Sequence, residues 1–194
     1  MGTATKVGLL AFNTRETIVV AAKELFAERG YHGVTVEDIG NSLGLTGPSI
    51  YKHVGGKMDL LIAVFDYVTD SILAFATPIC ESGSPPEAVL DRLIDLHIEF
   101  VLSDPTYLRI YHQEQQSLPP ERFKTQRSKA AQYIRLWDRQ LAQACPSMDP
   151  DERFVVVRAA FAVIEHVGSR IEVKENTALL LHNAAKAALF SQAC

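Results

Sequence analysis

The stretch TVEDIGNSLGLTGPSIYKHVGGK, residues 35–57, decides how this chain folds. Thr35 followed three residues later by Asp38 has the residue types of a capping box, which predicts that a helix begins there. The run from Gly44 to Thr46 predicts a short turn, and Thr46 has the residue type of an N-cap for a second helix. Two short helices joined by a three-residue turn form the pattern of a helix-turn-helix.

Helices are expected on both sides of this stretch. Residues 14–29 carry apolar side chains three and four apart, the spacing of an amphipathic helix. Gly30 is expected to end that helix, because only glycine takes the left-handed C-cap conformation without strain, and Tyr31 should fold back toward Phe26. After Gly55 and Gly56 a long helix is expected from about residue 57 to residue 78.

The rest of the chain also shows helical spacing, and no convincing two-residue alternation interrupts it. The prediction is an all-α fold of about nine helices, divided into a three-helix domain over residues 1–57 and a larger domain over residues 58–194. Proline-containing breaks separate the later helices, which are expected near 87–103, 105–117, 120–145, 150–172 and 175–192.

Charge is distributed unevenly between the two predicted domains. The net charge of −4 divides into +1 over residues 1–57 and −5 over residues 58–194. Phosphate binding depends on local positive charge, so the total does not exclude a nucleic-acid ligand. There is no leader with a basic and then an apolar part, and no run approaches the roughly 18 apolar residues that span a bilayer. A cytoplasmic protein with no membrane partner is expected.

Residues 15–61 resemble the N-terminal DNA-binding domain of the TetR family of bacterial repressors. About a dozen residues at fixed spacing make this pattern more specific than a bare helix-turn-helix. The matching residues are Arg15, Ile18, Ala21, Ala22, Leu25, Phe26, Gly30, Tyr31, Thr35, Ile39, Gly44, Tyr51, His53, Lys57, Leu60 and Leu61. Beyond residue 61 the likeness is one of architecture: such proteins end in a divergent helical domain that binds ligands and forms a dimer.

The resemblance implies that the chain binds double-stranded operator DNA as a homodimer. A short recognition helix would enter the major groove, and other side chains would hold the phosphates. The resemblance assigns phosphate contacts to Thr35, Thr46, Tyr51, His53 and Lys57. The groove face would be Thr46, Gly47, Pro48, Ser49 and Lys52, with Lys52 and Ser49 reading bases and Pro48 or Thr46 contacting thymine methyl groups.

Two positions depart from the family pattern. Gly40 stands where an alanine is usual, which lowers helix propensity by roughly 1 kcal/mol. Val54 stands where many members have phenylalanine. Neither change removes an expected DNA contact. Gly47 on the groove face indicates close approach of the backbone or readout of DNA shape.

The larger domain carries material for an effector site and for a dimer seam. The candidate ligand-binding residues are His97, Phe100, Tyr107, Tyr111, Tyr133, Trp137, Phe161 and Glu165, although aromatic side chains at helical spacing are more often core. The candidate dimer residues, at coiled-coil-like spacing or with small side chains, are Phe154, Phe161, Ile164, Gly168, Ile171, Leu181, Ala185, Ala188 and Leu189. The alternative is that these stripes pack on the protomer's own core.

The family implies that an unidentified small-molecule effector shifts the fourth helix and so changes the spacing of the two DNA-reading heads. An activator, or a DNA-binding adaptor that senses a partner protein, stays open as a second reading. An enzyme is a third reading with little support: the chain lacks HExxH, ExxH, GxSxG and a phosphate-binding glycine loop, and His97-Ile98-Glu99 is a weak fragment. No catalytic residue, metal or cofactor is predicted.

Overall fold

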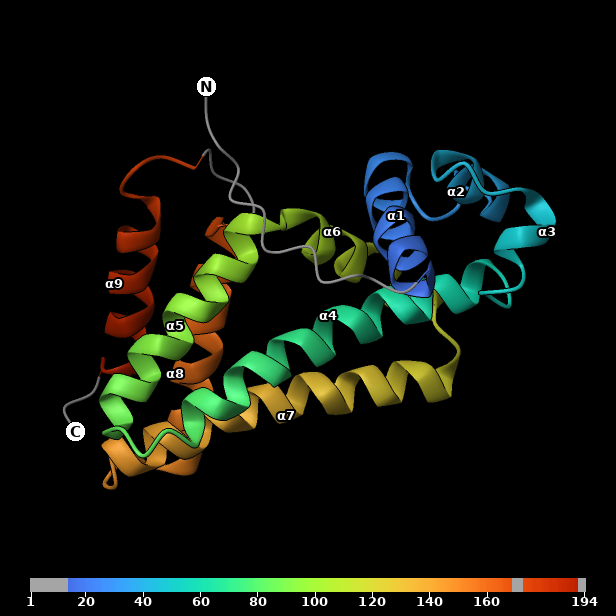
Figure 1. Ribbon diagram of the computed structural model, residues 1–194. Helices are drawn as coiled ribbons and strands as arrows, with labels where there is room; N and C mark the ends of the chain where they lie inside the picture. The colour runs from blue at the N-terminus through green and yellow to red at the C-terminus, as the bar shows by residue number, and fades with distance from the viewer. Residues whose placement is uncertain (1–13, 169–172, 192–194) are drawn as a thin grey trace. The chain divides into compact units, whose positions relative to one another are not determined.

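The computed structural model describes residues 14–168 and 173–191 of the chain (Figure 1). Within those residues it contains nine α-helices, one short 3-10 helix and one π-helical turn, and no strand. The all-α prediction is therefore confirmed. The elements are α1 (Thr14–Arg29), α2 (Val36–Ser42), α3 (Gly47–Ile50), α4 (Lys57–Cys80), α5 (Pro86–Ser103), α6 (Pro105–Glu114), η1 (Gln115–Ser117), α7 (Pro120–Ala144), α8 (Pro150–Ala162), η2 (Val163–Val167) and α9 (Thr177–Leu189).

The chain forms two compact units that divide between Phe65 and Asp66, inside α4. The division expected from the sequence lay earlier, after residue 57. The first turns of α4 belong to the N-terminal unit, and their side chains at Leu60 and Leu61 are fully buried. The helix that starts after the glycine pair is thus shared by the two units. Composition does not show where along such a helix one unit ends and the next begins.

In the N-terminal unit, local signals place α1 and α2 where the sequence predicts them (Figure 1). Gly30 has a φ of +76° and its N–H donates to the Phe26 carbonyl at 2.9 Å, so the helix closes on a left-handed residue. The Tyr31 ring then packs edge-on against Phe26 with centroids 5.2 Å apart.

Gly40 departs from the family pattern for a reason visible in the packing. It lies buried in α2, and a methyl group added there would approach the Leu45 carbonyl oxygen to 3.3 Å and the Ile50 side chain to 3.5 Å. Ile39 and Ile50 are both fully buried at this crossing of α2 and α3. The missing methyl group therefore lets the two helices approach closely, at the cost of helix propensity.

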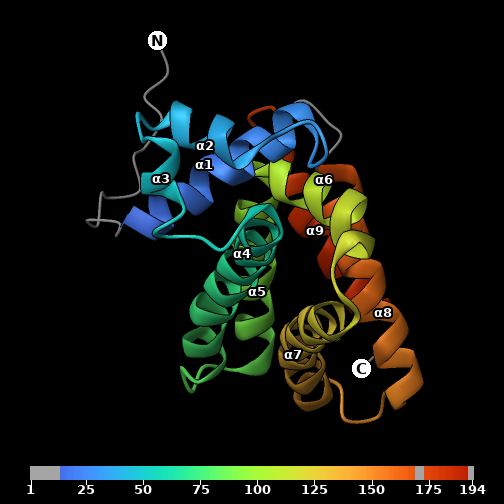
Figure 2. The same ribbon diagram turned by 90° about the vertical axis from the view of Figure 1, so that its right-hand side faces the viewer.

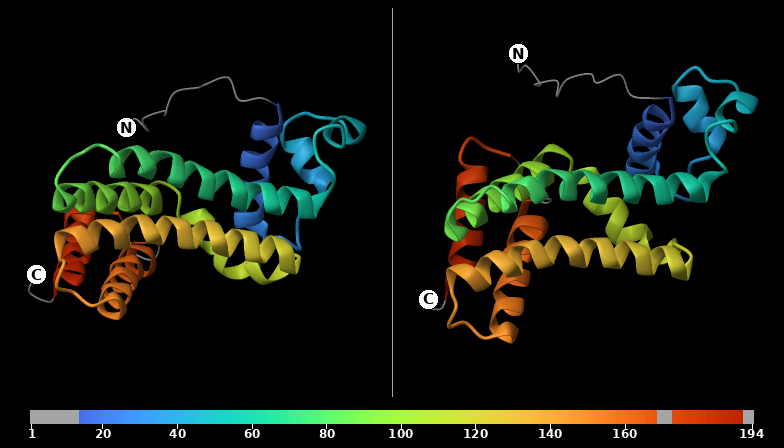
Figure 3. Two further views of the ribbon diagram at one scale, coloured as in Figure 1. Left: turned by 90° about the horizontal axis from the view of Figure 1, so that it is seen from below. Right: turned by 60° about the horizontal axis from the view of Figure 1, so that its bottom comes forward.

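The C-terminal unit is built around α5, which packs against α7 on one side and against α9 on another (Figures 2 and 3). The helices α8 and α9 also pack on one another. One face of α5 is buried along its whole length, through Val89, Leu90, Leu93, Ile94, His97, Ile98 and Val101. This arrangement brings the middle of α5 against α7 and α8.

Composition alone would allow α4 to cross a membrane. Its most apolar 18-residue window has a mean hydropathy of 1.6, although Asp59, Asp66 and Asp70 keep the helix from forming an uninterrupted apolar run. Half of that window is buried inside the fold. Packing against the protein itself accounts for the apolar composition.

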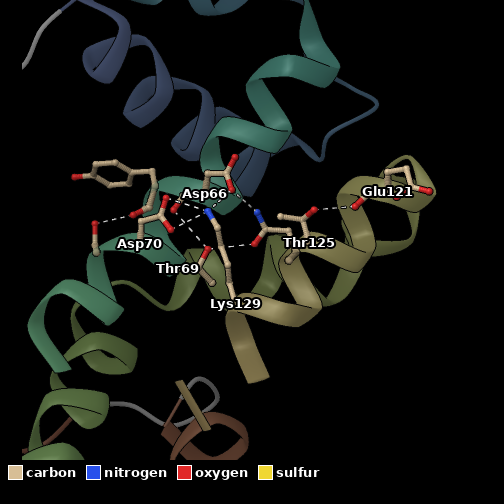
Figure 4. A network of polar contacts seen from close by, with 9 residues as sticks. Asp66, Thr69, Asp70, Glu121, Thr125 and Lys129 are labelled. Carbon is tan, nitrogen blue, oxygen red and sulfur yellow. Dashed lines mark hydrogen bonds and ion pairs between the residues drawn. The ribbon is translucent and has the colours of Figure 1, made fainter. Parts of the chain in front are cut away.

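A polar network joins the C-terminal part of α4 to α7 (Figure 4). The Lys129 ammonium lies 2.6 Å from Asp66 Oδ1 and 2.8 Å from Asp70 Oδ1. The buried Gln126 amide donates to Asp66 Oδ1 and accepts from the Thr69 hydroxyl. Burial opposes the charge on Lys129, but the hydrogen bonds to Asp66 and Asp70 outweigh it and raise the pKa of the ammonium. The network fixes the register between the two helices.

Candidate nucleic-acid interface and effector site

None of the nine residues predicted to contact DNA is buried. Thr35, Thr46, Pro48, Tyr51 and Lys52 are exposed. The other four are half-buried and are Gly47, Ser49, His53 and Lys57. They are the N-cap residues of α2 and α3, residues of α3 itself, residues that follow α3, and the first residue of α4. The N-terminal unit thus presents all nine at or near its surface.

Thr35 forms the complete capping box that the sequence predicts. Its hydroxyl donates to Asp38 Oδ2 at 2.7 Å and accepts from the Asp38 N–H at 3.1 Å, while the Thr35 N–H donates to the same carboxylate at 2.8 Å. These hydrogen bonds lower the pKa of Asp38. The Thr35 hydroxyl is therefore engaged in the cap in the absence of DNA.

Tyr51 is held by a residue that the sequence interpretation missed. Its hydroxyl donates to Glu37 Oε1 at 2.9 Å, and this hydrogen bond raises the pKa of the Tyr51 phenol. Glu37 lies in the first turn of α2, where a carboxylate is also favoured by the helix dipole. In the sequence, Glu37 stands two residues after the N-cap Thr35, where an acidic residue is common for the helix alone. No local signal therefore identifies its contact with Tyr51.

Lys57 is anchored at the start of α4 by the loop that follows α1. Its ammonium donates to the His32 carbonyl at 3.2 Å and lies 4.4 Å from the centroid of the Tyr31 ring. An ammonium has three N–H donors, so the carbonyl occupies only one of them. Lys57 therefore ties α4 to the N-terminal unit and retains donors for an anion.

Gly47 is not required by the fold. A methyl group added at this position would meet no atom within 4 Å, and the residue does not have a positive φ. Thr46, which precedes it, is the N-cap of α3 but makes no side-chain cap hydrogen bond. The glycine thus has no packing reason inside the protomer.

Eight residues predicted to bind a ligand are brought together in the C-terminal unit. His97 lies at the centre of the group, with ring centroids 4.7 Å from Phe161, 5.7 Å from Tyr133 and 6.2 Å from Trp137. Phe100 links His97 to Tyr107, and Tyr107 contacts Tyr111. We call His97, Phe100, Tyr133, Trp137 and Phe161 the aromatic cluster; α5, α7 and α8 contribute its members.

Polar atoms of the aromatic cluster are buried without hydrogen-bond partners. They are the Tyr133 hydroxyl, the Trp137 indole nitrogen and both ring nitrogens of His97. Burial raises the pKa of the Tyr133 phenol well above its usual value, and a weak hydrogen-bonding contact with the Trp137 side chain lowers it only in part. Buried polar groups in proteins are nearly always hydrogen-bonded, so these atoms need an explanation.

Glu165 approaches the cluster from the π-helical turn η2. Its Oε1 lies 3.4 Å from His97 Nε2. The sequence predicts one continuous helix from residue 150 to residue 172, but the hydrogen-bonding pattern changes to the π type at Val163. Single π-helical turns are rare and frequently occur at functional sites.

The predicted dimer seam falls mostly on side chains that the protomer itself buries. Most of its residues lie in the protomer's own core: Phe161, Ile164, Gly168, Leu181, Ala185 and Leu189 are buried. A methyl group at Gly168 would come within 3.0 Å of Val101, because α5 packs there. Ala188 is half-buried, Phe154 is 63% exposed, and Ile171 lies outside the described residues.

The helices α8 and α9, and the turn η2 between them, also expose large apolar side chains. We call these exposed side chains the α8/α9 apolar face; they are Phe154 and Val155 of α8, Val167 of η2, and Leu179 and Leu180 of α9, exposed by 63, 62, 41, 60 and 66% respectively. Soluble monomers rarely expose that much apolar surface on adjacent elements. The run of three leucines at 179–181 was a signal for this face, since a helix cannot turn three consecutive residues toward one core.

Family models match both parts of the chain. The model described as "Bacterial regulatory proteins, tetR family" matches residues 18–64. The model described as "Tetracyclin repressor-like, C-terminal domain" matches residues 83–169. The two matches cover the reading head and the domain that holds the aromatic cluster.

Individual relatives are distant. The transcriptional activator FasR of Mycolicibacterium smegmatis is 22% identical over 107 residues, 55% of this chain and 49% of FasR. The transcriptional repressor KstR2 of Rhodococcus jostii is 27% identical over 124 residues, 63% of this chain and 61% of KstR2. The matches thus span only about half to three fifths of these two relatives.

A solved structure shows the same fold over nearly the whole chain. AibR, described in complex with isovaleryl coenzyme A and operator DNA, has a TM-score of 0.76 and 18% identity, covering 91% of this chain and 97% of AibR. At that identity the likeness establishes the fold and no detail of the site.

Proposed function

This chain belongs to the TetR family of bacterial regulatory proteins, and on that basis we propose that it is a transcriptional repressor. It acts as a homodimer that binds a palindromic operator in the bacterial cytoplasm and leaves the operator when a small molecule binds. One observation carries the proposal: both family domains match in order along the chain. Family members regulate transcription and are not typically enzymes.

The contacts with DNA divide into two groups. Thr35, Thr46, Tyr51, His53 and Lys57 hold phosphates, and the face of α3 from Thr46 to Lys52 enters the major groove. The accessibility of these nine residues supports the assignment. Gly47 supports it too, since a glycine with no packing role inside the protomer fits close approach of DNA to the backbone.

Substituting Lys57 by alanine is expected to weaken binding to all DNA sequences alike and to reduce the salt slope of binding by about 1, because one phosphate contact is lost. Lys52→Ala is the matched variant and should instead change the preference between operators. Titration of labelled DNA duplexes with each variant, at several salt concentrations, measures the affinity, its salt slope and the preference between operators. Equal effects of the two variants across sequences would contradict this division.

Glu37→Gln is expected to raise affinity for DNA roughly fivefold at low salt, because it removes a negative charge beside a phosphate-binding tyrosine. The glutamine keeps an oxygen that accepts from the Tyr51 hydroxyl, so the side chain stays in place. Glu24→Gln, the same change at an exposed position of α1, should leave affinity unchanged. Unchanged affinity for Glu37→Gln would show that Glu37 lies outside the DNA interface.

The α8/α9 apolar face supports dimerisation, since it presents large exposed side chains on two packed helices. A second copy of the chain covers this face in the proposal and places two reading heads at the separation of two half-sites. Dimers account for palindromic operators, because the two-fold symmetry of the protein matches that of the DNA.

The aromatic cluster supports an effector site in the C-terminal unit. Trp137 and Tyr133 lie on α7, the same helix that carries Lys129 and Gln126 of the network with α4. A ligand that displaces α7 would change this network and bias α4, which continues into the N-terminal unit. The coupling requires only that the ligand binds one of the two conformations better.

The first experiment is selection of DNA from a random pool by the purified protein, with its mass in solution measured in parallel. Recovery of one palindrome by a dimer supports the regulator and supplies the operator. Failure of a folded protein to enrich any sequence at low salt would refute the proposal. Transcription from that operator, with and without the protein, then separates a repressor from an activator such as FasR is described to be.

A further inference from the structure

We propose that the effector is a neutral, largely apolar ring compound with an oxygen that accepts hydrogen bonds from Trp137 and Tyr133 inside the aromatic cluster. This inference rests on the proposed function, because it names the chemistry of the ligand that the C-terminal unit senses.

The unpartnered atoms indicate what the ligand offers. The Trp137 indole N–H can only donate, and the Tyr133 hydroxyl is an available donor. Both side chains are at least nine-tenths buried, with exposures of 0 and 5%. A buried donor without a partner destabilises the folded protein. A ligand oxygen that accepts hydrogen bonds from these two donors would remove this destabilisation. The resulting stabilisation exists only in the ligand-bound protein.

The charge beside the cluster disfavours an anion. Burial raises the pKa of Tyr107, and the neighbouring Tyr111, Glu165 and Asp66 raise it further. Glu165 also raises the pKa of Tyr133. Arg127 and Arg158 act in the opposite sense on Tyr111, but the charged group in contact with the cluster is Glu165, whose Oε1 lies 3.4 Å from His97 Nε2. A carboxylate bound beside His97 would therefore be repelled as well as desolvated. A cationic group does not accept a hydrogen bond from the Trp137 N–H. The acceptor that fits is therefore an oxygen of a neutral group.

The rings provide the apolar part of the site. Phe161 lies 4.7 Å from His97, 5.5 Å from Tyr133 and 4.8 Å from Trp137, so one residue contacts the three polar-tipped rings. Phe161 and Glu165 lie one helical turn apart, across the change from α-helix to π-helix. A shift of this turn on ligand binding would move Phe161 and Glu165 together.

The chain contains a single tryptophan, so its indole N–H gives one assignable signal in a nitrogen–proton correlation spectrum. Titration of the full-length protein with acetophenone is expected to move this signal downfield and to saturate. Ethylbenzene, which has the same shape without the oxygen, should bind without the downfield shift, and benzoate should not bind. Saturable binding of benzoate, or of benzyltrimethylammonium in place of acetophenone, would overturn the proposal, as would no response to acetophenone.

Tyr133→Phe provides a second test with two readouts. Removing an unpartnered buried hydroxyl should raise the melting temperature of the free protein, whereas affinity for acetophenone should fall about tenfold. Tyr67→Phe, the same change at a half-buried position of α4, should leave acetophenone affinity unchanged. An unaltered affinity in Tyr133→Phe would remove Tyr133 from the site. Operator selection is scored separately: if it succeeds while these tests fail, only the ligand chemistry is wrong.

Discussion

Substituting Leu180 by glutamate is expected to convert the dimer into monomers and to lower affinity for a palindromic operator by roughly 10²- to 10⁴-fold. Leu180 is 66% exposed in the protomer and lies on the α8/α9 apolar face. Burying a carboxylate there against a second copy has a large desolvation cost. Each reading head would then bind its half-site alone and lose the effective concentration that the partner head supplies.

Mass in solution and operator titration check this result together. Gln132→Glu adds the same charge at an exposed position of α7 and should change neither quantity. A helix content equal to that of the parent protein shows that Leu180→Glu still folds. A folded variant that stays dimeric would place the seam on another surface and contradict the assignment of the α8/α9 apolar face.

The second large effect is expected from Phe26→Ala, which should destabilise the N-terminal unit by roughly 3 to 5 kcal/mol. Phe26 is 1% exposed and packs against Tyr31, which in turn supports Lys57. A unit of about 65 residues has a small free energy of unfolding, so a loss of this size can unfold it. Operator binding should be lost, whereas the dimer should persist, because the α8/α9 apolar face belongs to the other unit.

Urea unfolding followed by two signals separates the units. Tryptophan fluorescence reports only the C-terminal unit, since the single tryptophan is Trp137. Circular dichroism reports both. In Phe26→Ala the loss of helix should therefore begin before the fluorescence changes. Phe75→Ala, the same change at a side chain that is 65% exposed, should alter stability by less than about 0.5 kcal/mol. Coincident transitions in Phe26→Ala would argue that the two units unfold as one.

The helices could be predicted because their ends are set by residues close in sequence. Thr35 with Asp38 fixes the start of α2 through hydrogen bonds across three residues, and Gly30 ends α1 through its own backbone conformation. The π-helical turn at Val163 was not predictable in this way. The turn η2 packs against α5 and α9, and a period of apolar residues does not distinguish an α-helical turn from a π-helical one.

The candidate DNA contacts followed from a fixed pattern, but their partners did not. Nothing in the sequence pairs Tyr51 with Glu37, since the residues lie 14 positions apart and meet only when α2 and α3 cross. The same holds for Lys129 and Asp66, which are separated by 63 positions. Such contacts need the tertiary arrangement before they can be recognised.

The sequence by itself determined the family, the helix-turn-helix and the surface set from Thr35 to Lys57, because caps, glycines and motif spacing act over a few residues. Only the tertiary structure decided which apolar stripe of α8 and α9 faces inward. A helix with two apolar stripes has the same apolar periodicity whichever stripe is buried. The sequence therefore does not distinguish Leu181 from Leu180, and the packing of α9 against α5 decides which of them is buried. Leu181 takes the core position, and Leu180 stays exposed on the protomer.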